Sequence, residues 1–359
     1  MNAESSPHWF GAPLSRATTT AALRVIHADG APTGLTLSEI AQRASISRPS
    51  AEEAVNELVD RELLAEVLPD PDAPRPVGRP AKRFRFRAEY GYVLGVDIGI
   101  HKVLALCADL GGTVLGSHRI EVSAEHSNAD RVDVARTALK RAARASNVRL
   151  ADVLAVGAGT TGPIDPSTGT VARSPALLQW SGVDVRQALS GIGTGPVMVG
   201  NDANLGALAE HWQGAAADAS DVVYILAGHQ VSVGILLGGA LRVGRHGAAG
   251  EIGVLPAARW YEARDALAAG KPVDDPTFID DLATGIAASA LLIDPDKIVI
   301  GGGLSHAGDT LLKPLKQRLD ELCLFPIPVQ ASRLGEQNVA LGAVRLALDH
   351  LESSLFATA

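Results

Sequence analysis

The stretch that decides the fold is GYVLGVDIG at residues 91–99. It is an apolar run that ends in an aspartate and a glycine, a pattern typical of a buried strand followed by a tight turn. Two further runs follow directly, VLALCADLGG at 103–112 and TVLGSHRIEV at 113–122. They predict a second strand that ends in a hairpin, and then a third strand. Helical spacing follows over 130–146, so this region is expected to begin as three strands and a helix.

Later segments repeat the design of an apolar strand that leads into a glycine-rich exit. They are VLAVGAGTTGPID at 153–165, PVMVGNDAN at 196–204, DVVYILAGHQVSVGILLGGAL at 221–241, which is expected to be a hairpin of two strands, and KIVIGGGLS at 297–305. Helices are predicted over 205–212 and 309–322. Strands and helices mixed in this way predict an α/β protein that holds its ligands at strand exits.

Composition limits the class of protein. The chain has 359 residues, of which 47% are hydrophobic and 20% charged, which predicts two to three domains and excludes disorder throughout. We expect no membrane span, because no apolar run reaches about 18 residues, and no secretory signal in residues 1–20. Cys107 and Cys323 lie in apolar contexts and are too few for a disulfide framework, so we expect buried packing and a cytoplasmic location.

The segment before residue 90 has a different pattern, dominated by helices. Apolar residues at helical spacing predict helices over 18–28, 35–44 and 49–64. The short break between the last two predicts a helix-turn-helix. Strands predicted over 65–68 and 83–87 flank a proline-rich loop, and together they are expected to form a wing.

Basic residues gather in this wing. Six lysines and arginines and no acid occur between residues 75 and 87, in a chain whose net charge is -8. Such a block can neutralise DNA phosphates, and its Gly-Arg-Pro tip is suited to a minor groove. The residues that we expect to contact DNA are Ser47, Arg48, Ser50, Asn56, Arg79, Lys82 and Arg83. The alternatives are a solvated linker for the basic block, and capping or surface solvation for the helix residues.

Four glycine-rich motifs, in their order and behind such a helical segment, resemble the ROK family (repressors, open reading frames and kinases). The motifs are VDIG at 96–99, GNDAN at 200–204, GAAGEIG at 247–253 and VIGGGLS at 299–305. The resemblance implies a two-lobed actin-like ATPase/sugar-kinase fold (ribonuclease H-like, α/β), preceded by an all-α/winged-helix DNA-binding domain. The expected boundaries are 1–88 for the DNA-binding domain and 89–359 for the effector domain.

In kinases of the family, an aspartate takes a proton from a sugar hydroxyl while glycine-rich hairpins hold the ATP phosphates. Asp202 in GNDAN matches that catalytic base. The resemblance also implies that Asn201, Asp202 and Glu251 bind sugar hydroxyls. The alternatives are helix capping by Asn201 or Asp202, and packing of Glu251 against a basic neighbour.

The phosphate loops and the zinc motif depart from the kinase pattern. The first loop of the family reads Asp-x-Gly-Gly-Thr-Lys, whereas residues 97–102 read Asp-Ile-Gly-Ile-His-Lys; the second reads Gly-Thr-Gly, whereas residues 228–230 read Gly-His-Gln. Bulky side chains there fill space that phosphates need, so we expect no ATP. Val254 replaces a family histidine and no cysteine cluster follows, so we expect neither zinc nor another metal. Ala176 replaces an asparagine of the sugar pocket.

The combined prediction is a DNA-binding transcriptional regulator, a repressor, with a degenerate and non-catalytic sugar-kinase domain in which Asp202 is vestigial. We expect a cytoplasmic homodimer or higher oligomer on an inverted repeat in double-stranded DNA, with a sugar or related effector and no membrane contact. Two alternatives stay open. One is an active ATP-dependent carbohydrate kinase with an added DNA-binding head, and the other is a ligand-free dimer module that only positions such heads.

Overall fold

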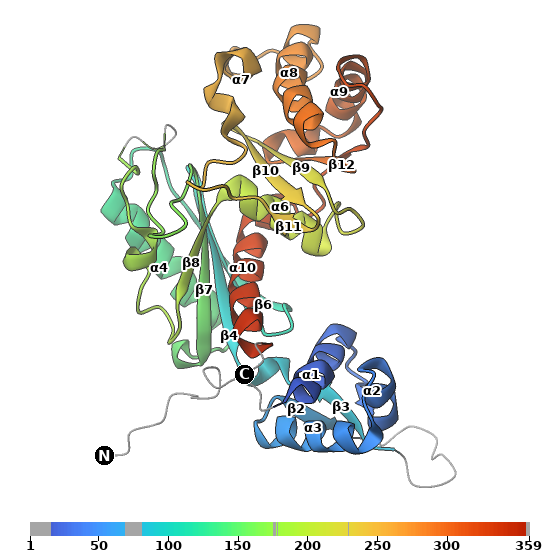
Figure 1. The fold of residues 1–359 in the computed structure, drawn as a ribbon. Helices are drawn as coiled ribbons and strands as arrows, with labels where there is room; N and C mark the ends of the chain where they lie inside the picture. Colours follow the sequence, from blue (N-terminus) through green and yellow to red (C-terminus); the bar gives the residue numbers. More distant parts are fainter. Residues whose placement is uncertain (1–15, 69–80, 175–176, 178, 229, 357–359) are drawn as a thin grey trace.

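The computed structural model describes residues 16–68, 81–174, 177, 179–228 and 230–356. Along the chain they form a small head and then two lobes, each built on a five-stranded sheet (Figure 1). Three residues that the sequence singles out, Arg79, Ala176 and His229, lie outside the described residues.

The head combines three helices with a three-stranded antiparallel sheet of order β1-β3-β2. Its elements are α1 (Ala17–Asp29), β1 (Leu35–Thr36), α2 (Leu37–Arg43), α3 (Arg48–Asp60), β2 (Leu64–Val67) and β3 (Arg83–Phe86). The predicted end of α3 at Leu64 is wrong. The helix stops at Asp60 because Glu62 adopts left-handed backbone (φ 59°), and the chain then turns into β2. Val59, which follows the buried Leu58 in the last turn of the helix, is 39% exposed.

The first lobe has the sheet order β6-β5-β4-β7-β8. Its elements are β4 (Tyr92–Ile98), β5 (Lys102–Asp109), β6 (Val114–Glu121), α4 (Asn128–Ala145), β7 (Val153–Thr160), α5 (Val185–Ala188) and β8 (Val197–Asn201). β4, β5 and β6 pair antiparallel, while β4, β7 and β8 pair parallel. Alternate residues of β4 face opposite ways: Leu94 and Val96 pack in the core with α4, and Val93 packs toward the helix on the other face, α10 (Asn338–Leu355).

The second lobe repeats the same strand order as β11-β10-β9-β12-β13. Its elements are β9 (Val222–Ala227), β10 (Val231–Leu237), β11 (Ala240–Leu241), α7 (Trp260–Ala268), α8 (Pro276–Ile293), β12 (Lys297–Gly301), α9 (Asp309–Leu322) and β13 (Val329–Ala331). Among the described helices, α8 alone is long and apolar enough to cross a membrane by length and composition. More than half of it is buried in the core of this lobe.

Two helices, α6 (Asp202–Gln213) and α10, lie between the two sheets (Figure 1). α10 rests directly on the backbone of the first sheet. A Cβ added at Gly157 would lie 1.9 Å from the carbonyl oxygen of Ala343, and one added at Gly95 would lie 2.5 Å from that of Ala340. The close approach therefore requires glycine at both strand positions.

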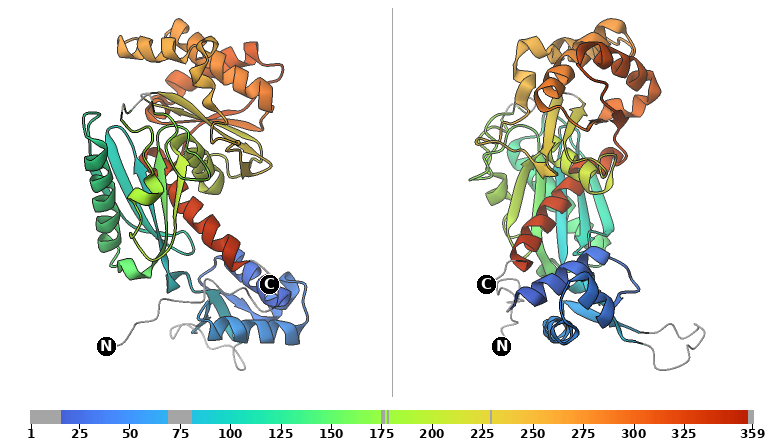
Figure 2. Two further views of the ribbon diagram at one scale, coloured as in Figure 1. Left: turned by 60° about the vertical axis from the view of Figure 1, so that its left-hand side comes forward. Right: turned by 45° about the vertical axis from the view of Figure 1, so that its right-hand side comes forward.

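The far end of α10 contacts the head (Figure 2). Leu23 of α1 and Leu351 of α10 belong to one continuous apolar cluster. Arg24 donates a hydrogen bond to the carbonyl oxygen of Phe356 (3.3 Å), and its guanidinium lies 5.5 Å from the centre of the Phe356 ring. The His27 ring meets the Phe356 ring edge-on, 5.5 Å between centres, and its Nε2 lies 3.9 Å from Glu352 Oε1. Head and effector domain are thus joined through both apolar and polar contacts.

Candidate ligand site and nucleic-acid interface

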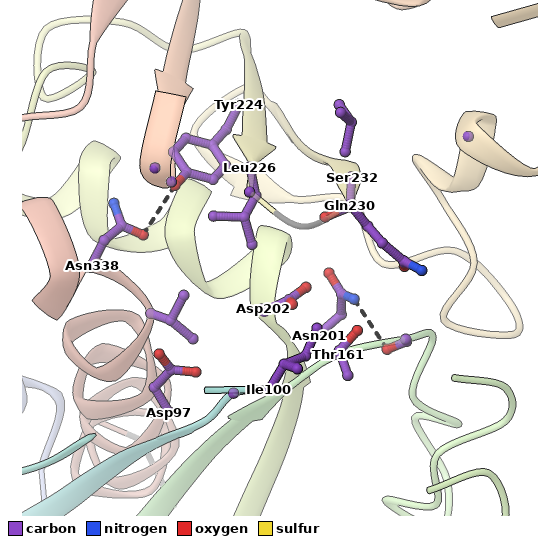
Figure 3. A pocket seen from close by; sticks show the side chains of 18 of the residues that line it. Asp97, Ile100, Thr161, Asn201, Asp202, Tyr224, Leu226, Gln230, Ser232 and Asn338 are labelled. Atoms are coloured by element: carbon purple, nitrogen blue, oxygen red, sulfur yellow. Dashed lines mark hydrogen bonds between the residues drawn. The ribbon is translucent and has the colours of Figure 1, made fainter. Parts of the chain in front are cut away.

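A cavity of about 720 Å³ lies between the two lobes, where strands of both sheets end (Figure 3). The first lobe contributes residues that follow β4, β7 and β8, and the second lobe contributes β9, β10 and the turn after β12. Its lining includes Asp97, Ile100, Thr161, Asn201, Asp202, Tyr224, Gln230, Ser232, Glu251 and Asn338. The structure therefore brings Asn201, Asp202 and Glu251 to one cavity.

Asn201 and Asp202 occupy the start of α6. The Asn201 side-chain oxygen accepts hydrogen bonds from the amides of Ala203 (2.9 Å) and Asn204 (3.2 Å), and its amide donates to the carbonyl oxygen of Gly162 (3.0 Å). Asn201 is thus the helix cap, which was one of the two roles that the sequence allowed. One Asp202 oxygen accepts from the Ala203 amide (2.8 Å).

The cavity raises the pKa of each of its three inner acids. Burial raises the pKa of Asp202 to about 7; Asp97 and Glu251 add to the rise, and the Ala203 amide opposes it. Burial raises the pKa of Asp97 to about 6, against the attraction of Lys102, and it also raises the pKa of Glu251. A carboxyl group that is part-protonated near neutral pH can both donate to and accept from a sugar hydroxyl. Such clustered pKa shifts are typical of binding and catalytic sites.

The turn between β4 and β5, which matches the first phosphate loop, already has protein partners. Arg131 of α4, 1% exposed, donates to the carbonyl oxygens of Gly99 and Ser123 (2.6 Å for the latter). Lys102 donates to the carbonyl oxygen of Glu336 (2.7 Å), and its ammonium lies 3.6 Å from the Glu336 carboxylate. Ile100 is half-buried and lines the cavity (Figure 3).

The second loop faces the first across the cavity. The amide of Gly228 donates to the carbonyl oxygen of Gln230 (3.1 Å), which closes a tight turn between β9 and β10. The stretch in which the family carries its zinc motif leads into α7, from which Trp260 and Arg264 line the cavity. Among the described residues, no group of three His, Cys, Asp or Glu side chains is placed to hold a metal ion.

On the head, the predicted DNA-contacting residues that the structure describes fall into two groups, one at or on α3 and the other on the wing. Ser47 caps α3 by accepting from the Ser50 amide (3.2 Å), and the two hydroxyl oxygens lie 2.9 Å apart. Arg48 and Asn56 are exposed on α3. Lys82 pairs with Glu66 across the wing (2.7 Å).

Arg83 has a structural role that the sequence did not predict. Its guanidinium donates to the carbonyl oxygens of Thr33 (3.0 Å) and Gly34 (2.9 Å), and it lies 3.3 Å from the Glu39 carboxylate. It therefore ties the wing to the chain between α1 and α2. Arg131 and Glu336 were missed as well, because each acts on a loop far away in the sequence and no local pattern marks it.

Comparisons with known proteins agree with this architecture. The model of the ROK family matches residues 93–268 and 276–350. A glucokinase of Halalkalibacterium halodurans is 27% identical over 286 residues, which cover 65% of this chain and 86% of the relative. The DNA-binding transcriptional dual regulator NagC of Escherichia coli is 24% identical over 367 residues, which cover 86% of this chain and 87% of the relative.

Among solved structures, a ROK family transcriptional regulator described as a homolog of the E. coli MLC protein aligns with a TM-score of 0.72 at 20% identity. The alignment covers 95% of this chain and 97% of that one. It therefore includes the head and both lobes, and it confirms the predicted fold.

Proposed function

The chain belongs to the ROK family, as its motifs predicted, and from that premise we propose that it is a DNA-binding transcriptional regulator, a repressor. Its two-lobed domain binds a sugar or a related small ligand and transfers no phosphoryl group. The observation that carries the proposal is the head, whose α2, turn and α3 precede a β-wing and are joined to the effector domain. The glucokinase relative covers only 65% of the chain, whereas the regulator NagC covers 86%.

The position of α3 supports DNA binding by the head. The helix lies on the side of the head that faces away from both lobes (Figure 1), so a duplex reaches it without meeting the effector domain. Arg48 at its first turn is exposed, and the N-terminal residues of such a helix are the ones that reach base edges. The basic wing supplies phosphate contacts. A cytoplasmic homodimer would place two heads on an inverted repeat.

The state of the first phosphate loop supports the loss of phosphoryl transfer. A phosphate needs free backbone amides and an available lysine. Here Ile100 stands where the family has glycine, and Lys102 is bound to Glu336. A phosphate would have to compete with that carboxylate for the lysine.

α10 connects the cavity to the head and could transmit a movement of the lobes to it. It begins at Asn338, which lines the cavity and exchanges hydrogen bonds with Glu210 (2.8 Å) and Tyr224 (3.3 Å). The helix is 18 residues long, which is about 27 Å at 1.5 Å per residue, and it ends against α1. A ligand that closes the two lobes would shift α10 and with it the head.

Selection of bound fragments from genomic DNA tests the proposal. The parent chain should enrich fragments that share an inverted repeat, and Arg48→Ala should lose that enrichment. Arg149→Ala removes an exposed arginine of the effector domain and is the matched control. Enrichment that is absent in the parent, or equal in Arg48→Ala, would count against the assignment.

A second candidate function is an active carbohydrate kinase with an added DNA-binding head. The observation that favours it is Asp202, whose pKa of about 7 suits a general base at neutral pH. ATP turnover with a panel of hexoses that depends on Asp202 would distinguish this candidate from the first.

A further inference from the structure

We propose that Glu52 reads a base in the DNA major groove, as the middle member of a stripe formed by Arg48, Glu52 and Asn56 on α3. The proposal rests on the proposed function as a DNA-binding regulator. It adds a carboxylate, with a defined base preference, to the contacts expected from the sequence.

The three residues share one exposed face of the helix. They are spaced four residues apart, so they lie one above the other, and all are exposed. The adjoining face is buried in the head and consists of Ala51, Ala54, Val55 and Leu58. No hydrogen bond or ion pair joins a member of the stripe to another residue that the structure describes. Arg48 and Glu52 do not pair with each other, although their spacing allows it.

The other acids of α3 face a different neighbour. Glu53 forms an ion pair with Arg16, at the start of α1. Glu57 accepts from the Thr19 hydroxyl (2.8 Å) and lies 3.1 Å from the Arg61 guanidinium. Asp60 lies four residues beyond Asn56, and both line the groove between α1 and α3. Glu53 and Glu57 are therefore engaged toward α1, Asp60 lies at the far end of the helix, and Glu52 is the acid one turn from Arg48.

The stripe presents three functional groups that recognise different base edges. A guanidinium fits the O6 and N7 acceptors of guanine, a side-chain amide fits the N6 and N7 of adenine, and a carboxylate accepts from the N4 amino group of cytosine. A carboxylate near DNA is repelled by phosphates, so a place in the groove is stable only where a base donates to it. Glu52 thus rejects guanine and thymine, which offer no donor in the major groove. It favours cytosine over adenine, because the N7 of adenine places a second acceptor beside the N6 amino group.

Selection from a randomised duplex library, carried out with the full chain, tests the inference. The variants are Glu52→Gln and, as the matched control, Glu53→Gln, which removes the same charge from the neighbouring position. Both should bind DNA somewhat more tightly, because each removes a negative charge. Only Glu52→Gln should change the consensus, from cytosine toward adenine at one position of each half-site, since glutamine fits adenine. The preference for cytosine should fall by about 5- to 150-fold.

The outcomes separate this inference from the proposed function. A parent chain that enriches no DNA would overturn the proposed function itself. A parent that yields a consensus which Glu52→Gln leaves unchanged would overturn the role of Glu52 and leave DNA binding intact. A consensus changed equally by Glu52→Gln and Glu53→Gln would also overturn it, because the effect would then be one of charge alone.

Discussion

The substitution Asp202→Asn should stabilise the folded chain at alkaline pH. The pKa of Asp202 is raised by burial to about 7 from an ordinary value of 3.8. As pH rises, the carboxyl of the unfolded chain therefore ionises first, and the folded state loses stability between about pH 4 and about pH 7. A rise of about three pKa units corresponds to about 4 kcal/mol for a fully buried group. Asp202 is part-exposed, so screening by water reduces the expected gain to about 2 kcal/mol.

Urea unfolding of the parent and of Asp202→Asn, measured from pH 4 to pH 8, provides the assay. Asparagine keeps the oxygen that accepts from the Ala203 amide, so the variant loses charge without losing the hydrogen bond. The two unfolding free energies should be close near pH 4 and should differ by about 2 kcal/mol at pH 8, with the variant the more stable. Asp133→Asn, at an exposed position of α4, is the control and should change the free energy of unfolding neither at pH 4 nor at pH 8. A variant that is less stable at pH 8, or a gain that does not depend on pH, would refute the reasoning.

Three further outcomes are expected. Arg48→Ala should weaken binding to the selected DNA by about 5- to 150-fold in a fluorescence titration, because a base contact is lost; equal affinity would rule the contact out. Gly157→Ala should lower the free energy of unfolding by about 1–3 kcal/mol, because the added methyl group meets the backbone of α10, whereas Gly228→Ala has open space around it and should be tolerated. Phe356→Ala removes the ring that contacts Arg24, so hydrogen exchange in α1 and the last turn of α10 should speed up by about 5- to 30-fold, for a loss of about 1–2 kcal/mol; unchanged exchange would mean that the ring does not hold the head.

Local patterns were enough to predict most of the sheets and the place of the cavity. An apolar run that ends in glycine, as in β4, marks a buried strand whatever surrounds it. The carboxyl ends of such strands meet, so a site could be expected where β8 ends at Asn201 and Asp202. That Glu251 joins them in one cavity was implied only by the resemblance to the ROK family. What Asn201 does there needed the structure, because an asparagine before a helix can cap it or bind a ligand.

Long-range packing accounts for what the sequence did not predict. α8 and α10 were absent from the prediction. α8 is apolar along most of its length and therefore lacks a clear polar face. Arg83 donates to the carbonyl oxygen of Gly34 and Arg131 to that of Gly99, both in distant turns, and carbonyl groups carry no sequence signal. The end of α3 was misplaced because Leu63 and Leu64 continue the helical spacing although they belong to the turn and β2.

The most direct measurement of the central claim is ATP turnover by the same preparation that binds its selected DNA, assayed with a panel of hexoses for the parent and for Asp202→Asn. We predict DNA binding by both proteins and no turnover that depends on Asp202. Sugar phosphorylation by the parent that disappears in Asp202→Asn would contradict the claim that this chain is a DNA-binding regulator that transfers no phosphoryl group.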